Sequence, residues 1–89
     1  MVKAEINDDT TEYRFYTADV QKLKKAISST GKFDTEIATA GKLSKEVLTK
    51  AKKGGRVARA KADGICNGLN IHGCTPKATR DDLFPTGEN

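Results

Sequence analysis

The residues of this sequence best suited to chemistry are two cysteines and the single histidine, Cys66, His72 and Cys74. Thiolates and imidazoles are ligands that Zn²⁺ prefers, but a structural zinc site almost always has four of them. No Cys-x-x-Cys pair is present. A carboxylate would have to complete the set, and we therefore predict no metal site. The available carboxylates are Asp63, Asp81 and Asp82.

Cys66, His72 and Cys74 are also candidates for a catalytic pair or a disulfide. A cysteine could act as a nucleophile with His72 as its base, but neighbours within one short loop rarely reach that geometry. The remaining carboxylates are scattered, so we predict that the protein is not an enzyme. Two states of Cys66 and Cys74 stay open. They are free thiols in a reducing compartment, or they form a disulfide that stabilises the fold by about 2–3 kcal/mol.

Gly-Lys pairs occur twice, at Gly31-Lys32 and Gly41-Lys42, and were tested as phosphate loops. A Walker loop needs Ser or Thr after the lysine and another glycine five residues before the glycine of the pair. Phe33 and Leu43 follow the two lysines, so neither pair qualifies. We predict no cofactor.

Positive charge is concentrated in the middle of the chain. Residues 20–61 carry a net charge of +9, between residues 1–19 at −3 and residues 62–89 at −2. Such a block favours association with an acidic protein surface or with nucleic-acid phosphates. Phe33 is the only ring in the block, which argues against the stacking platforms of single-strand binders. The residues predicted to form the basic binding surface are Lys22, Lys25, Lys42, Lys45, Lys50, Lys52, Lys53, Arg56 and Arg59.

The elements that must position these groups belong to one small α+β domain, because 89 residues support a single core. Alternating apolar residues over 1–16, around a polar turn at residues 7–10, predict a β-hairpin. The basic helical block, residues 17–63, is predicted to hold two amphipathic helices that pack on this hairpin and a short third helix. The two longer helices should span residues 17–31 and about 34–53. Together they could suggest a helix-turn-helix, but the linker at residues 31–35 is generic.

The final segment, residues 64–89, contains four of the eight glycines and both prolines, and we predict an irregular tail. Within it, Leu83 and Phe84 have two interpretations. They form an apolar docking tail for a partner, or they fold back onto the thin core of a chain with only 36% hydrophobic residues.

These features lead to a predicted function. We expect a non-catalytic accessory or scaffold subunit that docks on a larger protein complex with an acidic surface. The alternative is a nucleic-acid-binding protein that contacts phosphates, and a second alternative is a secreted, disulfide-stapled effector or inhibitor. No run approaches the roughly 20 apolar residues of a membrane span. We therefore expect a soluble protein, intracellular or organellar.

Overall fold

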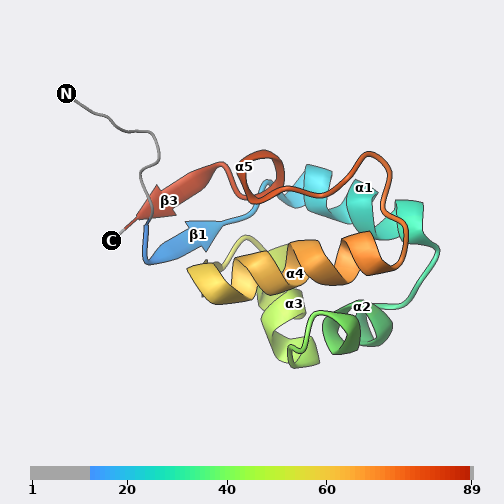
Figure 1. The fold of residues 1–89 in the computed structure, drawn as a ribbon. Helices are drawn as coiled ribbons and strands as arrows, with labels where there is room; N and C mark the ends of the chain where they lie inside the picture. Colours follow the sequence, from blue (N-terminus) through green and yellow to red (C-terminus); the bar gives the residue numbers. More distant parts are fainter. Residues whose placement is uncertain (1–12, 89) are drawn as a thin grey trace.

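The computed structural model describes residues 13–88, which form five helices and a three-stranded sheet (Figure 1). The predicted α+β class is thereby confirmed. In chain order the elements are β1 (Phe15–Thr17), α1 (Val20–Thr30), α2 (Asp34–Ala40), α3 (Lys45–Lys52), β2 (Arg56–Ala58), α4 (Arg59–Ile71), α5 (Arg80–Leu83) and β3 (Thr86–Glu88).

The sheet is antiparallel and has β1 at its centre, in the order β2-β1-β3. Tyr16 in the middle of β1 lies opposite Val57 of β2 and Gly87 of β3, and its side chain is buried. The first strand of the predicted N-terminal hairpin lies outside the described residues. The second strand is β1, and it packs against the helices as expected.

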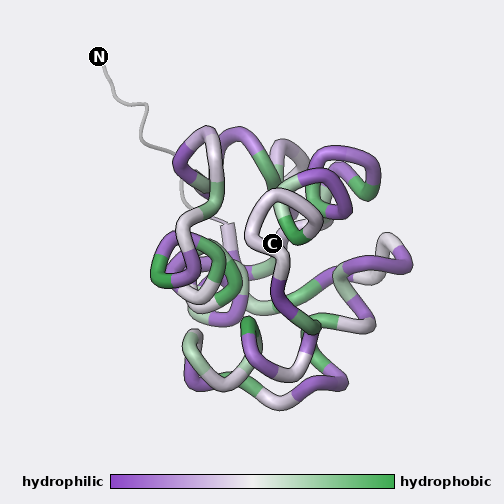
Figure 2. Tube along the Cα trace, turned by 90° about the vertical axis from the view of Figure 1, so that its right-hand side faces the viewer, coloured by the Kyte–Doolittle hydropathy of each residue, from purple (hydrophilic) through white to green (hydrophobic). Residues whose placement is uncertain are grey.

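The core lies mainly among the helices, which are amphipathic, and Tyr16 and Val57 join it from the sheet. Each helix combines hydrophobic and hydrophilic positions along its coil (Figure 2). The largest fully buried side chains come from α1, α2, α3, α4 and the segment after α5, so four helices and the C-terminal segment share one core. They are Leu23, Ile37, Leu48, Ile65, Leu69 and Phe84.

The predicted helix over residues 17–31 is α1, and its ends follow the local chemistry. Asp19 Oδ1 accepts a hydrogen bond from the backbone N–H of Lys22 at 3.2 Å, so Asp19 caps the helix, which begins at Val20 rather than at residue 17. Gly31 ends it in the left-handed conformation, with φ of 68°.

The predicted single helix over residues 34–53 is two helices, and this is the main correction to the sequence analysis. A turn from Gly41 to Ser44 separates α2 from α3, and Lys42 within it has a φ of 60°. The apolar pattern runs across the break because Leu43 also packs against the core. Hydrophobic periodicity alone therefore did not reveal the turn.

A second difference concerns the glycine-rich segment. Residues 56–63, predicted as a short helix, contain β2 and the start of α4, and α4 continues through Gly64 and Gly68 to Ile71. These glycines let α2 approach α4 closely. A Cβ on Gly68 would lie 2.3 Å from the carbonyl oxygen of Ile37, and one on Gly41 would lie 2.2 Å from that of Gly64.

The rest of the predicted tail contains α5 and β3. Asn70 fixes the loop before α5, because its side chain exchanges two hydrogen bonds with the backbone of Ala78 at 2.7 and 2.9 Å. No helix in residues 13–88 is long and apolar enough to cross a membrane.

Candidate nucleic-acid interface

Helix α3 buries one side and exposes the other. Leu48 and Ala51 are fully buried and Val47 packs partly against the core. Glu46 in the first turn and Lys50 in the last turn both suit the helix dipole. The outward side, which we call the α3 face, consists of Lys45, Glu46, Thr49, Lys50 and Lys53.

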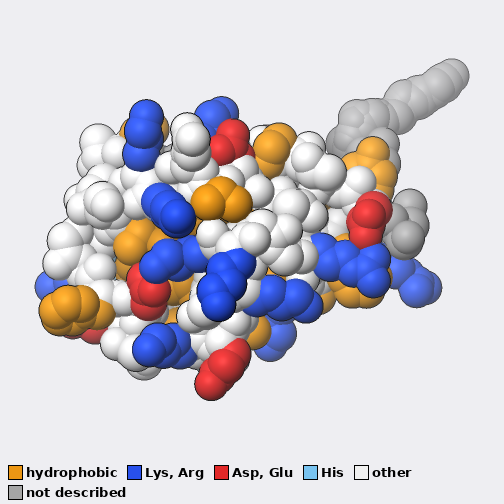
Figure 3. All heavy atoms as spheres, turned by 180° about the vertical axis from the view of Figure 1, so that it is seen from behind, with side chains coloured by type: hydrophobic (Ala, Val, Ile, Leu, Met, Phe, Trp, Pro, Cys, Tyr) orange, Lys and Arg blue, Asp and Glu red, His pale blue; other side chains and the backbone are white. Residues whose placement is uncertain are grey.

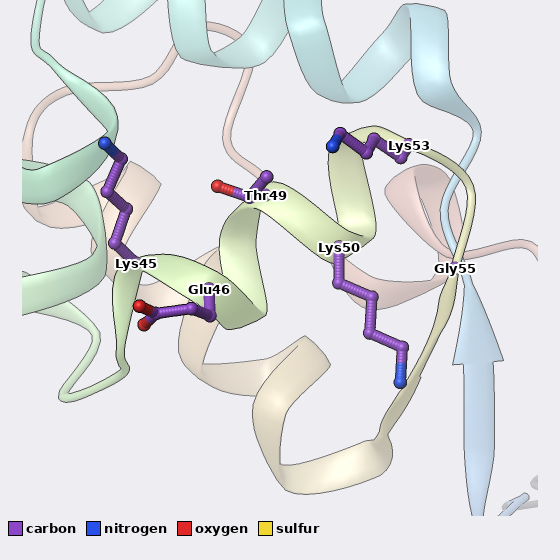
Figure 4. Close-up of a pocket in the computed structure, with 6 residues that line it drawn as sticks. All are labelled: Lys45, Glu46, Thr49, Lys50, Lys53 and Gly55. Carbon is purple, nitrogen blue, oxygen red and sulfur yellow. The ribbon is translucent and has the colours of Figure 1, made fainter.

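The α3 face borders an open hollow of about 570 Å³ whose remaining lining residue is Gly55 (Figure 4). Glu46 and Thr49 lie between Lys45 at one end and Lys50 and Lys53 at the other (Figure 4). The face therefore has cationic ends and a central part that offers a carboxylate and a hydroxyl.

Basic groups continue beyond both ends of the α3 face. At the Lys45 end, Lys32 and Phe33 line an adjoining hollow, and Phe33 is 77% exposed. At the Lys50 end, Arg56 and Lys61 line another hollow. Its floor includes Phe15, over whose ring the Arg56 guanidinium lies at 4.7 Å.

Several of the predicted basic residues are neutralised within the chain. Lys52 Nζ lies 2.7 Å from Asp34 Oδ2 in a half-buried ion pair. Lys22 Nζ lies 3.0 Å from Asp82 Oδ1, and this hydrogen bond and charge raise the pKa of Lys22.

Arg56 pairs with Glu88 of β3. Across the described residues, by contrast, no ion pair involves Lys45, Lys50 or Lys53 of the α3 face. The charges of these three lysines are therefore uncompensated, as are those of other exposed lysines in the described residues, such as Lys25 and Lys42.

The remaining predicted basic residues are distributed around the fold. Lys42 is exposed in the turn before α3, and Arg59 is exposed at the start of α4. Lys25 lines a separate hollow with Cys74 and Pro76. The side opposite that of Figure 1 carries more Lys and Arg than Asp and Glu side chains (Figure 3).

Sequence reasoning missed four residues of this region: Lys32, Glu46, Thr49 and Lys61. Glu46 and Thr49 were missed because the search was for positive charge alone. The spacing of residues 45, 46, 49, 50 and 53 does place them on one helical face, and that signal could have found them.

The cysteines and the histidine do not come together as a reactive centre. Both cysteines are buried and free, so the considered Cys66–Cys74 disulfide is not formed, and Cys66 lies inside α4. Burial, followed by the charge of Asp63, raises the pKa of the Cys66 thiol to about 12.

His72 has a structural contact. Its Nε2 lies 3.2 Å from the carbonyl oxygen of Glu36, which can only accept, so this nitrogen donates and joins the end of α4 to α2. Within residues 13–88 no three His, Cys, Asp or Glu side chains are placed to hold a metal ion.

The predicted docking tail is not exposed. Leu83 is 2% and Phe84 is 1% exposed, and both belong to the core. The structure thus corrects the docking interpretation in favour of the alternative, that these residues fold back. The physical reason is the small supply of large apolar side chains, which leaves Phe84 needed inside the molecule.

Comparison with known proteins identified no relative. The chain matches no protein-family model, and no significant match was found among curated protein sequences or solved structures.

Proposed function

We propose that this protein binds nucleic acid through the α3 face, with lysine side chains contacting phosphates. The observation that carries the proposal is the grouping of three exposed lysines without ion pairs, Lys45, Lys50 and Lys53, around one open hollow at α3. Lys22, Lys52 and Arg56 have carboxylate partners, whereas the lysines of the α3 face project outward without one in the described residues. Unpaired, exposed lysines are available to replace the counterions of a phosphate backbone.

The residues next to the α3 face also favour nucleic acid as the ligand. Lys32 extends the positive surface beyond one end of the helix, and Lys61 extends it beyond the other. Phe33 and Phe15 lie beside these cations. A surface of this composition suits a polyanion that is longer than the helix.

The accessory-subunit function expected from the sequence uses the same charge against an acidic protein. Its second anchor was the Leu83-Phe84 tail, whose burial removes that support. The basic surface alone makes a phosphate backbone the better-matched partner, since phosphate contacts need charge and little apolar area. Isolation of bound partners with and without nuclease distinguishes the two, because a protein complex survives the digestion.

The direct experiment measures the salt dependence of binding to a fluorescently labelled DNA duplex of about 20 base pairs. A variant with Lys50→Ala and Lys53→Ala loses two lysines of the α3 face. A matched variant with Lys25→Ala and Lys77→Ala loses the same charge from α1 and from the loop before α5.

The first variant is expected to bind more weakly and to reduce the slope of log K against log[salt] by about 2. The matched variant should retain the wild-type slope. Absence of binding at low salt, or equal losses in both variants, would refute an interface at α3.

A further inference from the structure

We infer that α3 enters the major groove of duplex DNA and that Glu46 and Thr49 read base pairs there. This inference rests on the proposed function and specifies its ligand. The proposed function requires only phosphates, whereas the inference requires a B-form groove and a sequence preference.

The arrangement of α2 and α3 resembles a DNA-binding helix pair. Two helices joined by a turn of three or four residues that contains glycine are typical of a helix-turn-helix, and residues Gly41–Ser44 form such a turn. The axes of α2 and α3 point in different directions (Figure 1). An α-helix with its side chains is about 10–12 Å in diameter, which fits the major groove at about 12 Å wide.

Helix α3 is held rigidly, as base reading requires. The ion pair between Asp34 and Lys52 ties the start of α2 to the end of α3. Leu48 and Ala51 are fully buried beneath the helix. The close approach of Gly41 to Gly64 then fixes the turn against α4.

The order of side chains along the α3 face also suits a DNA groove. Lysines at both ends, Lys45 on one side and Lys50 and Lys53 on the other, suit the two phosphate strands that border a groove. The residues between them would face the floor of the groove (Figure 4). The hydroxyl and methyl of Thr49 can contact base edges, including the thymine methyl.

Glu46 is the residue that distinguishes base reading from general phosphate binding. A carboxylate at the centre of a phosphate-binding surface is repelled by every phosphate near it. In the major groove, however, a carboxylate accepts a hydrogen bond from the amino group of cytosine, at N4. Glu46 has no ion-pair partner in residues 13–88 that would hold it away from the groove.

The test is selection from a DNA duplex library with a random core of about 12 base pairs, performed with the wild type and with Glu46→Gln. The control variant is Asp81→Asn, which removes an exposed first-turn carboxylate from α5. We expect the wild type to enrich a motif that contains a C·G pair. Glu46→Gln should relax the preference at that pair by about 10-fold, and Asp81→Asn should leave the motif unchanged.

Binding to the enriched sequence is then compared as DNA duplex and as RNA duplex. The deep, narrow major groove of A-form RNA excludes side chains, so the RNA duplex should bind more weakly. Thermal unfolding of Glu46→Gln checks that the variant is folded, since the residue also interacts with the helix dipole.

The outcomes separate the two claims. Binding to duplex DNA without any enriched motif, or a motif that Glu46→Gln and Asp81→Asn leave equally unchanged, would overturn base reading and leave phosphate binding intact. Absence of binding to every nucleic acid at low salt would overturn both.

Discussion

Asp34 and Lys52 stand at the opposite ends of the α2–α3 unit and are joined by an ion pair of 2.7 Å. Asp34 is the first residue of α2 and Lys52 is the last residue of α3. Their side chains are 24% and 29% exposed, so water weakens the attraction only in part. The pair closes the two helices into one unit, and it removes Lys52 from the basic surface predicted from the sequence.

Breaking this pair should destabilise the protein. We expect Asp34→Asn to lower the free energy of unfolding by about 1–2 kcal/mol, between the values for exposed and for buried pairs. Urea unfolding measures the change, and a double-mutant cycle with Lys52→Met isolates the coupling between the two residues. Additive effects in the cycle would show that the pair contributes nothing.

The contact between α2 and α4 should tolerate no side chain at Gly68. A Cβ there would lie 2.3 Å from the carbonyl oxygen of Ile37, so we expect Gly68→Ala to lower the stability by about 1–3 kcal/mol. Gly31→Asn is the control, because nothing lies within 4 Å of its Cβ and asparagine accepts the left-handed conformation. Equal melting temperatures for the two variants would contradict the close approach.

Two phenylalanines provide a matched pair that tests the core. Phe84 is 1% exposed and Phe33 is 77% exposed. Phe84→Ala should cost about 3–5 kcal/mol of stability, whereas Phe33→Ala should change it by less than about 0.5 kcal/mol. Denaturant unfolding checks both, and a stable, folded Phe84→Ala variant would restore the docking interpretation of the tail.

The buried thiol of Cys66 should make stability depend on alkaline pH. Its pKa is about 12 in the folded chain against an ordinary value of 9.0. Between about pH 9 and pH 12 the folded state therefore retains a proton that the unfolded state releases, and stability falls as the pH rises.

Urea midpoints measured from about pH 8 to about pH 10.5 should show this decline, and Cys66→Ala should reduce it. In the native wild type at about pH 8, Cys66 should also react slowly with a thiol reagent and rapidly once urea is added. Fast native reaction would place Cys66 at the surface.

Much of the fold follows from the sequence, and the exceptions have local causes. The alternating run at β1 and the apolar stripe of α1 gave the α+β class and the first helix. The break between α2 and α3 was missed because Leu43 in the turn is apolar and continues the helical pattern. A turn whose residues also pack on the core leaves no gap in the periodicity.

The extent of α4 was not predicted for another reason, which concerns its glycines. A glycine in a helix interior costs stability relative to alanine, so the glycine-containing segment from residue 64 onward is predicted from the sequence to be irregular. At Gly68 that cost is offset by close packing of α2 backbone, a tertiary contact that the sequence does not display. The same limit applies to the site, since the pairing of Lys52 with Asp34 depends on how α2 and α3 fold together.

The sheet also determines how this domain responds to a pulling force. β1 and β3 are antiparallel, and Phe15 at the start of β1 lies opposite Glu88 at the end of β3. Tension applied at Phe15 and Glu88 acts first on this pair, at one end of the ladder. Hydrogen bonds that run perpendicular to the strands are then loaded one after another. The hydrogen bonds between β1 and β3 should therefore break one after another at low force, and β3 should detach before the helices lose their packing.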